Sequence, residues 1–187
     1  MAQLPPVQAK PYSDHGAMAV LSRLDHSDQA EADHARGRPS SHLQLFADWR
    51  AVEPARVVSL VLCAGSEAAP IPFAVLGLSN TGQAGVASAA LLARDHVKFK
   101  RHLMATCLLI RDRMPAFCIE SGIHRIEART WGEHPRASLF LRACGFAFEA
   151  DLHGCGRDGR VVFRQFAWTN RNLEQENSHV HTKTENA

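Results

Sequence analysis

One stretch of the sequence gathers positive charge just where a long helix is expected to begin. Residues 94–104 read RDHVKFKRHLM and contain the cations Arg94, Lys98, Lys100 and Arg101. Such side chains bind oxyanions through charge-assisted hydrogen bonds. Glycine, which lets a backbone approach a phosphate closely, is missing from residues 86–121. The stretch is therefore either an anion site built from side chains or a solvated basic loop before a helix.

Metal ligands and standard nucleotide-binding motifs are not indicated. Among the eleven histidines, His96 and His102 stand six positions apart, and His179 and His181 lie in a polar segment. None of these pairs has ligand spacing on one helix face, so we expect no metal. The five cysteines include no C-x-x-C pair and are expected to be reduced core residues, at Cys63, Cys107, Cys118, Cys144 and Cys155.

The elements that would position the basic stretch alternate between helices and strands. Apolar residues at helical spacing predict two or three short helices within 17–49, a long helix over 102–120 and a short one over 136–144. Pro115 predicts a kink or an early end of the long helix, and Gly122 predicts its termination. β-branched or alternating runs predict six strands, at 57–63, 73–78, 86–93, 124–131, 146–152 and 161–168.

This order of elements predicts an α+β fold with a mixed, mostly antiparallel sheet flanked by helices. The last two strands are joined around Asp158-Gly159, a strong hairpin signal, so the chain should end its fold in a β-hairpin. Residues 1–16 and 169–187 are poor in apolar residues and are predicted to be tails, which leaves 17–168 as the domain.

The segment 123–146, IHRIEARTWGEHPRASLFLRACGF, resembles the second half of the Gcn5-related N-acetyltransferase (GNAT) family. In that family a strand of alternating charge leads to a short helix that ends in Gly-Phe, as at Gly145-Phe146. The resemblance extends over 17–168 in the order of elements. It implies a loop before the long helix that binds acetyl-coenzyme A, and here Arg94, Lys98, Lys100 and Arg101 would contact the phosphates.

The sequence departs from the family pattern at three places. The glycine-rich coenzyme loop is replaced by 94–104, the tyrosine that serves as general acid is replaced by Leu141, and the asparagine near the start of the short helix is replaced by His134. The resemblance implies a general base among Glu127, Glu133 and His96, although Glu127 also fits a surface position beside two arginines. Two hypotheses follow: a catalytically degenerate protein without cofactor, or an active acetyl-coenzyme A-dependent N-acetyltransferase.

A narrower resemblance is to acetyltransferase-like proteins of short-tailed, double-stranded DNA phages. It depends on short matches in the same order, at Arg23-Leu24, Asp28, Glu31, Trp49, Val75-Leu76-Gly77, Phe140 and Gly145-Phe146. It implies a structural or assembly component of a phage particle, with other phage structural proteins or further copies of itself as partners. Its place would be the host cytoplasm during assembly and then the virion.

Composition excludes several other classes. The 187 residues carry 21 Lys and Arg against 19 Asp and Glu, and this small net charge is no signature for binding nucleic acid or an anionic membrane. No run approaches the roughly 18 apolar residues of a membrane helix, and the first residues lack the apolar core of a secretory signal. Outside a particle, we expect the protein in the cytoplasm.

Overall fold

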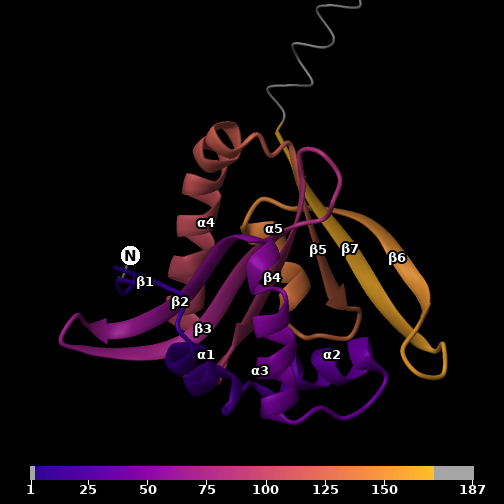
Figure 1. The fold of residues 1–187 in the computed structure, drawn as a ribbon, viewed down its shortest axis with the longest axis horizontal. Helices are drawn as coiled ribbons and strands as arrows, with labels where there is room; N and C mark the ends of the chain where they lie inside the picture. The colour runs from indigo at the N-terminus through magenta and orange to yellow at the C-terminus, as the bar shows by residue number, and fades with distance from the viewer. Residues whose placement is uncertain (1–2, 171–187) are drawn as a thin grey trace, which may run out of the picture.

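The computed structural model describes residues 3–170, and within them the chain forms one seven-stranded sheet in the order β1-β2-β3-β4-β5-β7-β6 (Figure 1). The strands are β1 (Gln8–Pro11), β2 (Arg56–Ser66), β3 (Ala69–Asn80), β4 (Val86–Ala93), β5 (Arg125–Trp131), β6 (Ala147–Cys155) and β7 (Val161–Thr169). The helices are α1 (Asp14–Leu21), α2 (His26–Arg36), α3 (His42–Ala51), α4 (Lys100–Ser121) and α5 (Ala137–Ala143), with a 3-10 turn η1 (Glu53–Ala55).

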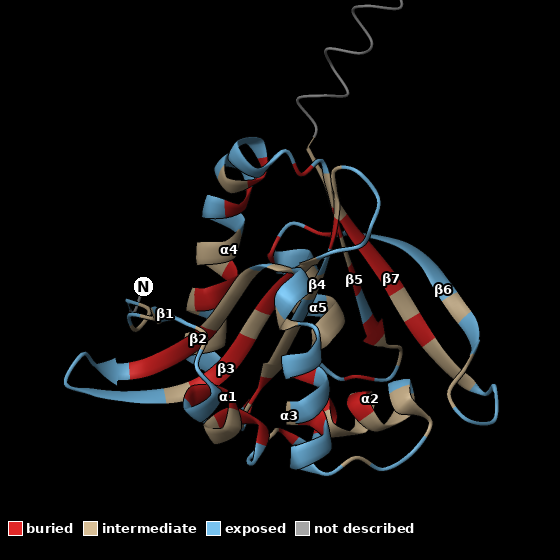
Figure 2. Cartoon of the chain, viewed as in Figure 1, coloured by how far each residue is buried: buried red, intermediate tan, exposed pale blue. Residues whose placement is uncertain are grey.

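Helices cover both faces of the sheet, and the alternation of side chains along the strands explains how. On β2, Val61 packs with residues of α1 and α3, whereas the next residue, Leu62, faces the side covered by the start of α4. On the α4 and α5 side, Ile126 of β5 and Phe166 of β7 pack against Cys107 of α4. Buried residues therefore follow the central strands, while β6 at the edge is largely exposed (Figure 2).

One pair of neighbouring strands differs from the rest and creates the place where a site can form. β4 and β5 run parallel and are paired only over Val86–Ser88 and Arg125–Glu127, while every other neighbouring pair is antiparallel. Beyond this short register the ends of β4 and β5 no longer pair with each other. Their backbone groups must therefore find other partners there.

The predicted fold class is confirmed: the sheet is mixed and mostly antiparallel, helices flank it, and β6 and β7 form the terminal hairpin. α4 ends at Ser121 and is capped by Gly122, which has φ 64°, as expected. Of the two outcomes predicted at Pro115, a kink or an early end, the early end is wrong, because α4 continues through this residue to Ser121.

The N-terminal boundary also differs from the prediction of a tail over 1–16. Gln8–Pro11 pair with Leu60–Cys63 of β2, and Ser13 caps α1 by accepting a hydrogen bond from the N–H of Gly16. The short segment has little apolar content of its own and is held by the strand beside it. Most of the C-terminal tail predicted at 169–187 lies outside the described residues. Within 3–170, no helix is long and apolar enough to cross a membrane.

Candidate functional site

The first turn of α2 lies against the end of β4. Asp25 is the N-cap of α2, and its Oδ1 accepts a hydrogen bond from the N–H of Ser27 at 2.9 Å. Its own N–H donates to the carbonyl of Ala93 at 2.9 Å. Its second oxygen, Oδ2, accepts from the N–H of His96 at 2.9 Å. One aspartate therefore caps a helix and also fixes the loop that leads from β4 to α4.

Asp28, one turn further along α2, is the centre of the cluster and is 7% exposed. Its Oδ2 accepts from the N–H of Ala93 at 2.7 Å, a backbone donor that β5 does not reach. Its Oδ1 contacts Nε2 of His134 at 3.0 Å and Nε2 of His96 at 3.1 Å. A buried carboxylate with three donors is well compensated for the loss of water.

His134 shows how the protons of the cluster are arranged. Its Nδ1 accepts hydrogen bonds from the N–H groups of Arg136 and Ala137, at 3.2 and 2.9 Å, at the start of α5. A nitrogen that accepts two hydrogen bonds carries no proton, so the ring proton is on Nε2 and is donated to Asp28. The imidazole thus acts as a cap for α5 and connects it to α2.

His96 lies between two carboxylates. Its Nε2 faces Asp28, and its Nδ1 lies 3.5 Å from Oδ1 of Asp25. Burial acts to lower the pKa of His96, but the hydrogen bond and charge of Asp28, together with Asp25, outweigh it and raise the pKa. Burial acts to raise the pKa of Asp28, but hydrogen bonds from His134 and His96 outweigh it and lower the pKa. The cluster therefore favours a charged imidazolium between two charged carboxylates.

Glu31 extends the network across to β5. Its Oε2 accepts from the hydroxyl of Thr130 at 2.7 Å and from the N–H of Trp131 at 2.9 Å. Burial raises the pKa of Glu31, against the opposing effect of these two hydrogen bonds. Asp28 and Glu31 thus bind the separate ends of β4 and β5, and α2 bridges the two strands where they no longer pair.

The spacing of Asp28, His96 and His134 would suit a metal, because one ligand atom from each lies within 4.8 Å of the others. The position of the proton on the His134 ring does not fit metal binding. A metal on Nε2 of neutral His134 would need the ring proton on Nδ1, where two backbone N–H groups already donate. The three side chains fit a chain of hydrogen bonds better than a metal site.

The four cations expected to contact coenzyme phosphates have different partners, although Arg94 and Lys98 lie beside the same Phe99 ring, at 5.7 and 5.6 Å from its centre. Arg94 donates to the carbonyl of Pro72 at 2.6 Å, and Arg101 donates to the carbonyl of Gln3. The Lys98 ammonium lies 5.6 Å from the centre of the Phe99 ring, and exposed Lys100 is the first residue of α4. Arg94 and Arg101 are therefore held by carbonyls at different places.

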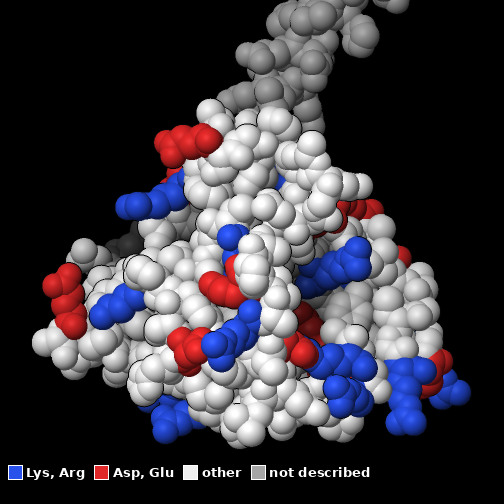
Figure 3. All heavy atoms as spheres, viewed as in Figure 1, with Lys and Arg blue, Asp and Glu red and all other residues white. Residues whose placement is uncertain are grey.

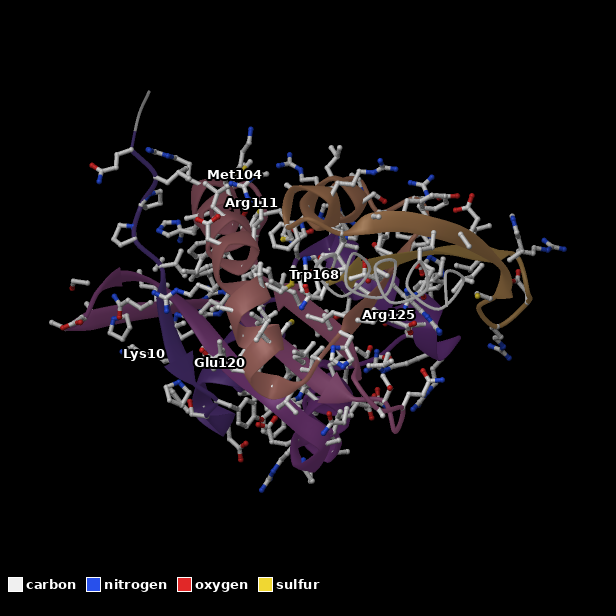
Figure 4. All side chains as sticks on the ribbon, turned by 90° about the horizontal axis from the view of Figure 1, so that it is seen from above. Lys10, Met104, Arg111, Glu120, Arg125 and Trp168 are labelled. Atoms are coloured by element: carbon white, nitrogen blue, oxygen red, sulfur yellow. The ribbon has the colours of Figure 1, made fainter. Side chains whose placement is uncertain are left out.

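The candidate bases are also in different surroundings. Glu127 accepts from Arg125 at 2.8 Å, as a strand-surface residue does, and Glu133 is exposed in the turn before α5. In the view from above, Arg125 lies on β5 well away from α4, which carries Met104 and Arg111 (Figure 4). Only His96 of the three proposed bases lies in the buried cluster.

His96 was predicted from the sequence as a candidate base, whereas its partners in the cluster were given no role. Asp28, Glu31 and His134 were noted only through resemblances, and Asp25 was not noted at all. A signal was present: Asp25, Asp28 and Glu31 recur every three residues at the start of a helix and so lie along one side of it.

The comparisons with known proteins bear on the fold. No protein-family model and no curated protein matches the sequence. Among solved structures, a GNAT-family acetyltransferase from Bacillus anthracis has a TM-score of 0.66 at 12% identity, over 90% of this chain and 98% of that one. The spermidine N-acetyltransferase of Vibrio cholerae, in complex with CoA and spermine, has a TM-score of 0.64 at 14% identity, over 88% and 96%.

A probable GNAT-family acetyltransferase from Chromobacterium violaceum is 20% identical, with a TM-score of 0.58 over 93% of this chain and 92% of that one. At such low identities the likeness shows the fold alone. The chain has the GNAT acetyltransferase fold, as the sequence resemblance implied.

Proposed function

We propose that this protein uses the acetyltransferase fold for binding rather than catalysis, as a structural or assembly component of a phage particle. The fold is that of acetyltransferases. The phage part depends on the order of short sequence matches described above. The partners would be other particle proteins or further copies of the chain.

The main support for a non-catalytic role is the way the loop before α4 uses its backbone donors. In the GNAT family this loop binds acetyl-coenzyme A. Here the N–H of His96 donates to Asp25, and the N–H of Lys98 donates to Asp95 at 2.9 Å. Two donors that a pyrophosphate would need are thus bound to the protein's own carboxylates. Those carboxylates would also repel an incoming phosphate.

The side chains around the loop strengthen this argument. Arg94 and Arg101 each donate to a backbone carbonyl oxygen, which occupies part of their capacity to bind an anion. His134 stands at the position of the family's asparagine and is 6% exposed. Its ring nitrogens are already hydrogen-bonded, Nε2 to Asp28 and Nδ1 to the start of α5. Leu141 offers no proton for a leaving thiolate.

Titration calorimetry with acetyl-coenzyme A tests the non-catalytic role directly. We expect a dissociation constant weaker than about 100 µM at physiological salt, and no acetyl transfer to simple amines. The proposal would be overturned by binding that is in the low micromolar range, survives 0.5 M salt and is abolished when Lys98→Ala is combined with Arg101→Ala. Arg113→Ala, an exposed change further along α4, is the matched control.

The particle role needs its own experiment. Mass spectrometry of purified particles of a phage that encodes the protein should find it at a fixed number of copies, retained after washing in high salt. Its presence only in the free fraction of the lysate would contradict a structural role and leave the binding experiment unaffected.

The alternative function is an active acetyl-coenzyme A-dependent N-acetyltransferase. One observation favours it: a similar structure, the Vibrio cholerae spermidine N-acetyltransferase, is in complex with CoA. In this case Lys98, Lys100 and Arg101 at the start of α4 would hold the phosphates through side chains alone. Saturable acetyl transfer that is lost in the Lys98→Ala and Arg101→Ala variant would establish it.

A further inference from the structure

A cavity at the opposite end of α2 from the buried cluster has the chemistry of an anion site. It has a volume of about 510 Å³ and lies between the C-terminal end of α2 and the tip of the β6–β7 hairpin. Its lining has three arginines and no carboxylate, and comprises Ala35, Arg36, Gly37, Arg38, Gly156 and Arg157. Basic side chains gather over these two elements in the space-filling view (Figure 3).

Two glycines among the lining residues stand where a side chain would be strained. Gly37 has φ +66°, and a Cβ there would lie 3.3 Å from the Cα of Arg157, so the hairpin rests directly on the end of α2. Gly156 has φ +73°, and a Cβ there would lie 2.5 Å from Cγ2 of Val161. Any other residue would be strained at either position. The arginines therefore lie on two segments, the end of α2 and the β6–β7 hairpin, that are held in direct contact.

The charges in the cavity are only partly balanced by the protein. Arg36 donates to Asp48 at 2.7 Å and to the carbonyl of Ala32 at 3.2 Å, which holds its guanidinium in place. Arg38 and Arg157 are exposed and form no ion pair with any residue in 3–170. The unpaired guanidinium groups of Arg38 and Arg157 therefore lie on different elements. Both border the cavity that Arg36 also lines.

We propose that this cavity binds a small phosphate-bearing ligand, such as a phosphate monoester or a diphosphate. A phosphate group carries about two negative charges near neutral pH, which matches Arg38 and Arg157. The planar guanidinium binds such oxyanions through pairs of parallel hydrogen bonds, so arginines suit this ligand better than lysines. The cavity is separate from the loop before α4, and the inference does not depend on the proposed function.

Titration of the full chain with inorganic pyrophosphate at low salt tests the proposal. We expect saturable binding that weakens at least tenfold when Arg38→Gln and Arg157→Gln are combined. Both residues are exposed, so the variant should keep its thermal stability. The matched control is Arg160→Gln on the same hairpin, where the arginine lies 3.7 Å from Asp158, and it should retain binding.

Several outcomes would overturn the site. Absence of saturable binding would do so, and so would equal weakening in Arg160→Gln, which would indicate only general attraction by positive charge. Loss of pyrophosphate binding in Lys98→Ala with Arg101→Ala, but not in the cavity variant, would place the anion at the loop instead. Equal affinity for succinate, or affinity only for nucleic acid, would show that the ligand class is wrong.

Discussion

The carboxylate of Asp28 accepts a hydrogen bond from the backbone N–H of Ala93 at 2.7 Å, across 65 positions of the chain. This contact brings a charged side chain of α2 to the end of β4, where the strand has lost its pairing with β5. In a sheet, an unpaired backbone donor at such a place would ordinarily be met by water or a ligand. Here the protein supplies the acceptor itself.

Removing the carboxylate of Asp28 should therefore be costly. In Asp28→Ala, the rings of His96 and His134 and the N–H of Ala93 lose their acceptor together. We expect the free energy of unfolding in urea to fall by about 3 to 5 kcal/mol, as when one partner of a buried ion pair is removed. The control is Asp48→Ala, because Asp48 is 55% exposed in its pair with Arg36, and that change should cost less than about 1 kcal/mol. Similar small losses in both variants would contradict the role given to Asp28.

The cluster also predicts how stability depends on pH. The pKa of His96 is raised, because Asp28 and Asp25 outweigh the opposing effect of burial. Its contribution is complete below the unfolded value of about 6.5 and is lost as the pH rises through the folded pKa. The pKa values of Asp25 and Asp28 are lowered, since hydrogen bonds outweigh burial. Their contribution is complete above about pH 4 and is lost as the pH falls through the folded pKa.

Asp25, Asp28 and His96 together should thus stabilise the fold most between about pH 4 and 6.5. We expect urea unfolding of the unaltered protein to show stability falling from pH 6 to pH 8.5. The His96→Gln variant should be less stable at pH 6, and its stability should fall much less between pH 6 and pH 8.5. His26→Gln, at a residue that is 92% exposed beside Asp25, should keep the slope. A pH dependence that persists in His96→Gln would mean that another group causes it.

The tautomer of His134 leads to a prediction about metals. Because its Nδ1 accepts from Arg136 and Ala137, Nε2 is protonated and turned toward Asp28. We expect the melting temperature to stay unchanged, within about 1 °C, when one equivalent of zinc is added or when a chelator is added. A zinc-dependent rise that disappears in His134→Gln would show that α5 gives up its cap to allow metal binding.

Sequence alone predicted the strands and the long helix because their signals are local. The β-branched run around Val61 and the Asp158-Gly159 turn determine conformation through neighbouring residues, and both have the predicted structure. β1 was missed because Gln8–Pro11 carry no strand pattern and are held by pairing with β2. Pro115 was predicted to kink the long helix or end it early, but Met114 and Cys118 beside it are buried and α4 is continuous.

The site was harder to predict, since its physical basis is not local. Asp25, Asp28 and Glu31 resemble the solvated face of a polar helix, and most carboxylates are exposed. Their burial depends on His96, Thr130 and His134, which are brought to α2 by β4, β5 and the turn before α5. Propensities and spacing along one helix contain no information about those partners.

Gly77, within the phage-like Val75-Leu76-Gly77 match, allows the last prediction. It lies on β3 without a positive φ, and a Cβ there would overlap the guanidinium of Arg56. The side chain of Arg56 is 5% exposed, stacks over Trp49 at 3.9 Å and pairs with Glu53 at 3.3 Å, so it has little freedom to move aside. Gly77→Ala should therefore cost about 1 to 3 kcal/mol of stability through overpacking.

In an Arg56→Ala background the same change should cost nothing, or stabilise by roughly 0.5 kcal/mol, because alanine suits a strand interior better than glycine. A double-mutant cycle in urea measures this coupling, and an equal cost in both backgrounds would show that Arg56 is not what requires glycine at this position.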